Sequence, residues 1–175
     1  MKALVLDVPR DNWETTKGMS MMDVPVPELD YQIYRHATVE YMANKLLQLG
    51  IPLVRPAGGH AIYLDAKQFL AHIPVHHYPG IALVNEVFLE GGIRAVELGS
   101  VMFGKVAPET GAESPAPFEL VRLTFPRRVY TQSHFDYIVE VMKQVGEKRP
   151  DIPGYRITKQ PPFLRHFSAH FEPIN

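Results

Sequence analysis

The sequence contains no cysteine, and this absence excludes several kinds of chemistry. Disulfides, thiolate nucleophiles and cysteine-ligated zinc all need a sulfur that the chain does not have. The chain also lacks an excess of charge of either sign, because 18 basic and 19 acidic residues leave a net charge of −1. We therefore expect no overall basic field of the kind that attracts nucleic acid or an acidic membrane surface.

Long apolar runs are missing as well. No stretch of the sequence approaches the ~20 consecutive apolar residues that a membrane-spanning helix needs. The opening residues MKALVLDVPR are apolar only briefly, because Asp7, Pro9 and Arg10 interrupt them too early for a secretory signal. Together with the lack of cysteine, these features favour a cytoplasmic protein without a membrane partner.

The hydrophobic pattern predicts alternating helices and strands. Between Asp30 and Leu49 apolar residues recur at steps of three and four, which predicts an amphipathic helix that ends at Gly50. Similar patterns predict helices at 66–73, 79–89 and 131–149, strands at 2–8, 51–56, 58–66, 93–103, 119–126 and around Pro161-Pro162, and loops at 9–29 and 104–117. This order predicts a two-layer α+β fold, an antiparallel or mixed sheet with helices on one face.

Arg122 stands out because it lies inside an apolar strand, FELVRLTFPRR, residues 118–128. Strand alternation places it on one face with Leu120 and Thr124. A buried arginine costs free energy unless an anion meets it, and the guanidinium fork fits a carboxylate. From the residues alone the partner is either a structural acid, such as Glu97 or Glu119, or a ligand, and composition favours the structural acid.

Two groups of histidines are candidates for a metal site, since imidazole is a common metal ligand. One group is HIPVHH, residues 72–77, and the other contains His166 and His170. A spacing of four brings two side chains together only on a helix, whereas the phenylalanines and prolines around His166 favour an extended chain. Extended residues four apart hold their side chains roughly 13 Å apart. A metal site is therefore the less favoured interpretation, and no serine or lysine stands in a nucleophile context.

Four stretches together resemble a known family, that of tryptophanase and tyrosine phenol-lyase, the β-eliminating lyases that use pyridoxal phosphate. The stretches are LGIPLVRPAGGHAIYLDAKQFLAHIP, GGIRAVELGSVMFGK, ELVRLTFPRRVYTQSHFDYIVEVM and PPFLRHFSAHF, in the family's order and at near-family spacing. The resemblance implies that residues 30–175 form the family's C-terminal small domain, as in fold-type-I pyridoxal-phosphate enzymes. The resemblance does not extend to residues 1–29, which form an unmatched N-terminal segment.

The same resemblance implies that the chain does not work alone. In the family, a large domain carries the Schiff-base lysine and the groups that hold pyridoxal phosphate, and the motif around that lysine is absent from this sequence. We therefore expect the family's cofactor, pyridoxal 5'-phosphate, but no cofactor-binding residue and no metal site in this chain. The expected partners are a separate large-domain subunit, a small amino-acid substrate and further copies of the chain in a homo-oligomer.

Three motifs of the resemblance carry candidate site residues. Arg122, in VRLT, matches the family arginine that binds the substrate α-carboxylate. Leu98, in AVELGS, stands where the phenol-lyase branch has arginine and the tryptophanase branch has an aliphatic residue. His166, in LRHF, stands where the phenol-lyase branch has phenylalanine and the tryptophanase branch has histidine, and Phe167 would belong to the same wall. The resemblance implies tryptophan as substrate and His166 as the catalytic residue beside an indole that must be protonated as it leaves.

Three functions therefore remain open at the level of sequence. The first is a component of a tryptophanase-like lyase that forms indole, pyruvate and ammonia only with a lysine-bearing large domain. The second is a free-standing relic, or a regulatory or interaction domain, that binds small carboxylates weakly or not at all. The third is a histidine metal-binding domain. The presence of Arg122, Leu98 and His166 favours the first.

Overall fold

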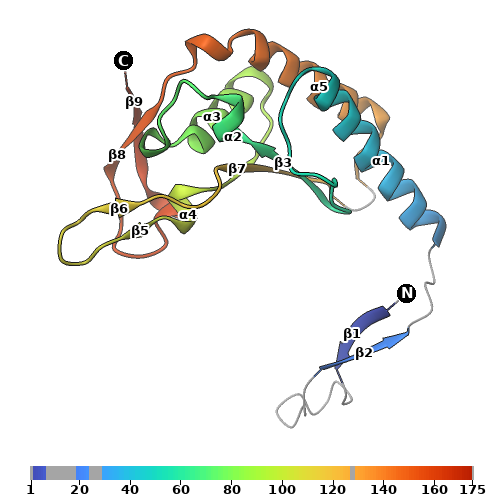
Figure 1. The fold of residues 1–175 in the computed structure, drawn as a ribbon. Coiled ribbons are helices and arrows are strands. Elements are labelled where there is room, and N and C mark those ends of the chain that lie inside the picture. The colour runs from blue at the N-terminus through green and yellow to red at the C-terminus, as the bar shows by residue number, and fades with distance from the viewer. Residues whose placement is uncertain (1, 7–18, 24–28, 127–128, 175) are drawn as a thin grey trace. The chain divides into compact units, whose positions relative to one another are not determined.

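The computed structural model describes residues 2–6, 19–23, 29–126 and 129–174 (Figure 1). Up to residue 29 it describes the backbone only. The chain forms two compact units, Met1–Tyr34 and Arg35–Asn175.

The first unit contains a pair of antiparallel strands. β1, Lys2–Leu6, pairs with β2, Met19–Asp23. The strand predicted at 2–8 is confirmed over residues 2–6, and residues 7 and 8 lie outside the described residues. The loop predicted at 9–29 is wrong for Met19–Asp23, because a methionine-rich segment without alternation shows no strand pattern until it has a partner. α1, Leu29–Gln48, begins in this unit and continues into the second.

The centre of the second unit is a three-stranded antiparallel sheet. Its strands are β3, Ala61–Asp65, β4, Val96–Leu98, and β7, Leu120–Thr124, in the order β3-β7-β4. The central position of β7 gives it a hydrogen-bonded neighbour along both edges. The predicted antiparallel sheet is confirmed, and the strand that carries Arg122 lies in its middle.

Helices pack against one face of this sheet (Figure 1). They include α1, α2, Ala66–Phe69, α3, Pro79–Gly91, and α5, Gln132–Glu147. Fully buried side chains from these helices and from the strands form one core, among them Met42, Leu46, Leu64, Leu83 and Met142. This burial supplies most of the favourable free energy of folding, and it confirms the predicted α+β fold.

The two faces of β7 differ in burial as its alternation predicts. Val121 and Leu123 point into the core and are buried, whereas Leu120 and Arg122 are half-buried and Thr124 is exposed. Arg122 therefore lies on the open face of the sheet, away from the helices.

Two predicted strands are corrected by the structure. Residues 51–56 form only an isolated bridge between Leu53 and Leu64, because Pro52 and Pro56 have no N–H to donate to a ladder. The strand predicted at 93–103 ends at Leu98, and the next residues form a short helix, α4, Ser100–Phe103.

The remaining elements are hairpins and short helical turns. β5, Lys105–Val106, pairs with β6, Glu113–Ser114, inside the segment predicted as a loop. β8, Tyr155–Lys159, pairs with β9, His170–Pro173, which confirms strands on both sides of Pro161-Pro162. Between them lies α6, Arg165–Ser168, so the extended chain expected around His166 is wrong. Two 3₁₀ turns complete the unit, η2, Val75–His77, and η3, Arg149–Asp151.

None of the described helices is long and apolar enough to cross a membrane.

Candidate functional site

Arg122 presents an unsatisfied donor on the open face of the sheet. Its Nε atom is buried and has no hydrogen-bond partner, and the side chain forms no salt bridge with any described carboxylate. A buried donor without a partner costs about 1–3 kcal/mol. Such a donor is the feature that a carboxylate ligand would satisfy.

The acids that sequence reasoning offered as structural partners lie on the other face. Glu97 is opposite Val121 in the register of β4 and β7, and paired residues share a face, so Glu97 points toward the helices. Glu119 precedes Leu120 by one residue and is almost completely buried, with 1% of its surface exposed. An ion pair between Arg122 and Glu97 or Glu119 is therefore not formed, because the sheet separates them.

Leu98 and Tyr63 share the open face with Arg122. Tyr63 lies directly opposite Arg122 on β3, and Leu98 lies opposite Leu120, two residues along β7. The structure thus brings two of the predicted site residues, Leu98 and Arg122, onto one surface. The Tyr63 hydroxyl is 3.4 Å from Nε2 of His60, which adds a polar pair at the end of β3.

The buried acids Glu97 and Glu119 hold the start of α4. Oε1 of Glu119 accepts hydrogen bonds from the backbone N–H of Ser100, at 2.9 Å, and from its hydroxyl. The carboxylate of Glu97 accepts from the N–H groups of Val101 and Met102, at 3.1 and 3.2 Å. These bonds satisfy the free donors of the first turn, which explains why residues 100–103 turn into a helix rather than continue β4.

The two carboxyl groups also lie close to each other. A Cβ atom added at Gly99 would collide with Oε2 of Glu119 and Oε1 of Glu97, so a larger residue there would have to displace both carboxylates. Burial, opposed by the N–H bonds and reinforced by the negative charge of Glu119, raises the pKa of Glu97 to about 7. Burial also raises the pKa of Glu119, against the opposing hydrogen bonds from Ser100.

His166 and Phe167 lie on α6, a different element from the sheet. Their rings are in contact, with centroids 4.1 Å apart, and Phe167 is 79% exposed. His166 lines an open cavity of about 470 Å³ together with residues of α4, β5 and the segment 160–165. Arg122 and Leu98 do not line this cavity, so the structure leaves the four predicted residues in two groups.

Arg165 was missed as a site residue by sequence reasoning. Its guanidinium donates from Nε to the carbonyl of Val101, at 2.8 Å, and from Nη2 to the carbonyl of Ser100 and to Glu113, both at 2.5 Å. Only its position beside His166 in LRHF could have pointed to it, since Glu113 and α4 lie more than 50 residues earlier in the chain.

None of the described lysines has the environment of a Schiff-base lysine. A Schiff-base lysine needs a desolvated or cationic environment to lower its pKa. Every described lysine side chain is exposed, at positions 45, 67, 105, 143, 148 and 159.

A histidine metal site finds no support within the described ranges. There, no three His, Asp or Glu side chains are grouped so that they could hold a metal ion. The rings of His76 and His77 make an edge contact with centroids 4.2 Å apart, and His170 lies on β9, outside the helix that carries His166.

Comparison with known proteins places the chain in a family. Residues 18–141 match the family model described as beta-eliminating lyase, and the chain belongs to this family. It is 52% identical to the tryptophanase of Hyphomonas neptunium over 143 residues and 51% identical to that of Salinibacter ruber over 144 residues. It is 45% identical to the tyrosine phenol-lyase of Symbiobacterium thermophilum over 146 residues.

These alignments are unequal in coverage. They include 82–83% of this chain but only 30–32% of the relatives. The chain therefore spans about a third of the length of the curated relatives that it matches.

Proposed function

We propose that this chain is the small-domain component of a pyridoxal-phosphate-dependent lyase that splits L-tryptophan into indole, pyruvate and ammonia. The observation that carries the proposal is the buried, partnerless Nε of Arg122 on the open face of the sheet, beside the apolar Leu98. Membership of the beta-eliminating lyase family supports the reaction class. Tryptophan is favoured over tyrosine because Leu98 and His166 match the tryptophanase branch.

The cofactor would be held by a large domain from a second polypeptide in the cytoplasm. One observation supports this division: every described lysine side chain is exposed, so none of them has the environment of a Schiff-base lysine. Residues 30–175 would then be the small domain, and several copies would assemble with the large domain into an oligomer. Pyridoxal phosphate would supply the electron sink that permits elimination.

Each candidate residue has a task that this chain can perform. Arg122 would bind the α-carboxylate of the amino acid through its guanidinium fork and so fix the orientation of the Cα–H bond. Leu98 and Phe167 would line the apolar wall against the indole ring. His166 would hold a proton near the ring carbon that is protonated as indole leaves.

The proposal is tested by supplying a large domain from a relative. The chain is co-expressed with the tryptophanase of Salinibacter ruber from which the matching C-terminal region has been removed, and indole release from tryptophan is measured. We expect activity from the pair and from neither part alone. Arg122→Ala should lower kcat/KM by about 100-fold or more, because the substrate loses its alignment. The matched control is Arg156→Ala, since Arg156 makes only an exposed ion pair with Glu172.

An active complex in which Arg122→Ala is as fast as the control would show that Arg122 does not bind the substrate.

A second measurement tests whether another polypeptide supplies the Schiff-base lysine. The purified chain alone is treated with pyridoxal phosphate and borohydride, and labelled peptides are identified by mass spectrometry. Selective labelling of a single lysine would contradict the proposal that another polypeptide supplies the Schiff-base lysine.

A non-catalytic interaction domain remains the second candidate. It is favoured by the exposed aromatic side chains of Phe163 and Phe167, which suit a binding surface without any chemistry. A complex that forms with the large domain but yields no indole would support it.

A further inference from the structure

The helix that carries His166 has no apolar anchor. α6 contains four residues, and none of them is buried. An isolated helix of this length is unstable in water because nucleation is costly, so tertiary contacts must hold it. The residue before it, Leu164, has a positive φ of 54° and is itself exposed, so the chain is also strained where α6 begins.

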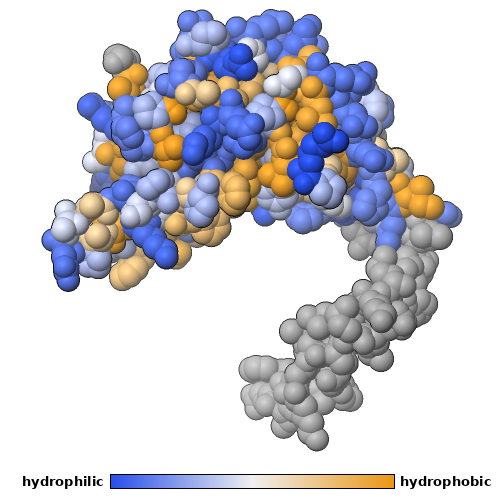
Figure 2. Space-filling view, viewed as in Figure 1, coloured by the Kyte–Doolittle hydropathy of each residue, from blue (hydrophilic) through white to orange (hydrophobic). Residues whose placement is uncertain are grey.

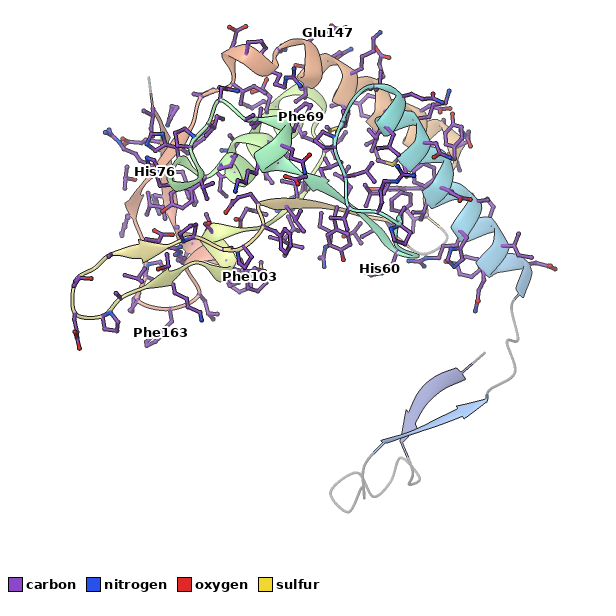
Figure 3. All side chains as sticks on the ribbon, in the orientation of Figure 1. His60, Phe69, His76, Phe103, Glu147 and Phe163 are labelled. Atoms are coloured by element: carbon purple, nitrogen blue, oxygen red, sulfur yellow. The ribbon has the colours of Figure 1, made fainter. Side chains whose placement is uncertain are left out.

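Arg165 supplies the contacts that hold α6. With 11% of its side chain exposed, it is well shielded although its neighbours Phe163 and Phe167 extend into solvent. Its guanidinium donates to two successive backbone carbonyls of α4, those of Ser100 and Val101. Figure 3 shows Phe103 of α4 and Phe163 beside α6 on the side of the unit that faces away from α3 and α5.

Glu113 completes this anchor from a third element. Its carboxylate accepts from Nη1 and Nη2 of Arg165, at 3.3 and 2.5 Å, and from the hydroxyl of Tyr78 at 2.9 Å. Burial alone would lower the pKa of Arg165, but its hydrogen bond and ion pair with Glu113 outweigh this and raise it. Burial and the carboxylate of Glu113 raise the pKa of Tyr78 to about 12. Arg165 therefore stays charged and Tyr78 stays neutral through the neutral pH range.

We propose that Arg165 is a positioning residue that fixes α6, and with it His166, against α4. The role of His166 in the reaction rests on the proposed function, whereas the anchoring of α6 does not. α4 is in turn held by Glu119, three residues before Arg122 in the chain. Arg165 thus connects the element that carries His166 to the sheet that carries Arg122, and sets the distance between the two halves of the site.

The test uses the full chain without cofactor or partner. Histidines are labelled with ¹³C at Cε1, and the His166 signal is assigned by its loss in His166→Gln. The variants are Arg165→Ala, Arg165→Lys, which keeps the charge but not the fork, and Glu113→Gln. The matched control is Arg156→Ala, which removes an exposed arginine from the same β8–β9 hairpin.

We expect both Arg165 variants to move the His166 signal toward that of an unfolded histidine. Backbone order parameters of residues 165–168 should fall from about 0.85 to below about 0.6, while those of α5 stay unchanged. Guanidinium ion below denaturing concentrations should partly restore the signal in Arg165→Ala and not in the control. If Arg165→Ala fails to fold, Arg165→Lys and Glu113→Gln decide the question by the same measurements.

An unchanged His166 signal and unchanged backbone order in the folded Arg165 variants would overturn the proposal.

The same variants, measured in the complex with the large domain, distinguish failure of the positioning role from failure of the proposed lyase reaction. If His166 moves in these variants but the complex with the large domain never forms indole, Arg165 positions α6 and the proposed reaction is wrong. If the complex is active and Arg165→Lys keeps the kcat of the control, the reaction stands and the positioning role is wrong.

Discussion

At the scale of single residues, Arg122 is a place where the chain gives up stability, because its buried Nε has no hydrogen-bond partner. Nothing in its strand requires a cation, because the neighbouring residues on β7 pack as ordinary strand residues and Val121 is fully buried. A buried donor without a partner is typical of a site whose ligand completes it. The sheet does not need Arg122 for its stability, so a functional role would explain why an arginine stands at this position.

Replacing Arg122 by methionine should therefore stabilise the free chain. The thioether fills a similar volume and leaves no unsatisfied donor, so we expect the free energy of unfolding to rise by about 1 kcal/mol. Urea titration followed by circular dichroism measures this, with the exposed Arg94→Met as control. A loss of stability in Arg122→Met alone would show that Arg122 has a structural partner.

Two helical glycines should respond in opposite directions to alanine. A Cβ at Gly91, the last residue of α3, would lie 2.5 Å from Cγ2 of Val141 on α5. At Gly146, inside α5, the nearest atom outside the helix is Cζ of Phe69 at 4.0 Å. We expect Gly91→Ala to cost about 1–3 kcal/mol by overpacking, and Gly146→Ala to add about 0.5–1 kcal/mol through helix propensity.

Denaturant unfolding measures whether the free energy of unfolding falls in Gly91→Ala and rises in Gly146→Ala. Equal stabilities for Gly91→Ala and the unmodified chain would mean that α3 and α5 can separate without cost.

At the scale of elements, the first turn of α4 is held by two glutamates, one before α4 in the sequence and one after it. Glu97 comes from β4 and Glu119 from the residue before β7, and their carboxylates accept the N–H groups of residues 100–102. Because both are buried near each other, they cannot both ionise without cost.

This pair predicts a loss of stability as pH rises. The pKa of Glu97 increases from 4.5 in the unfolded chain to about 7 in the folded one, chiefly through burial. The folded state thus favours the protonated form of Glu97. Its contribution to the free energy of unfolding is complete below pH 4.5 and is lost as the pH rises through 7. Over this interval the free energy of unfolding should fall by about 3 kcal/mol from Glu97.

Glu97→Gln removes this titration and should flatten the decrease between pH 4.5 and 7. Thermal melts at several pH values test it, with Glu140→Gln on the exposed surface of α5 as control. Identical pH profiles for Glu97→Gln and Glu140→Gln would disprove the assignment.

At the scale of the whole second unit, apolar side chains gather on one arm. Phe103, Val106, Phe163, Leu164 and Phe167 are exposed on α4, β5 and the tip of the β8–β9 hairpin. Figure 2 shows apolar surface among charged side chains on this arm. Exposed aromatic groups in such number favour association.

We expect the isolated chain to self-associate through this arm. Its mass by light scattering should rise with concentration, and the double variant Phe163→Ser, Phe167→Ser should reduce the effect. Leu89→Ser is the control, since Leu89 is equally exposed but lies on α3 among the helices. A mass that stays monomeric at every concentration would contradict this prediction.

Much of this fold follows from local patterns in the sequence. α3, α5 and β7 agree with their predicted positions, because period 3.6 or period 2 in the apolar residues specifies which face is buried. The errors occur where a distant partner decides the local conformation. Residues 100–103 are apolar enough for a strand, yet carboxylates from elsewhere turn them into α4.

The candidate site divides in the same way. The sequence by itself determined that Arg122 lies opposite the core-facing residues of its strand, because alternation is a property of any extended chain. Only the tertiary structure decided that Glu97 lies on the far side of the sheet from Arg122, and that Arg165 is bound to α4. Those contacts join segments tens of residues apart, and their formation depends on how the helices and strands pack, which no local pattern encodes.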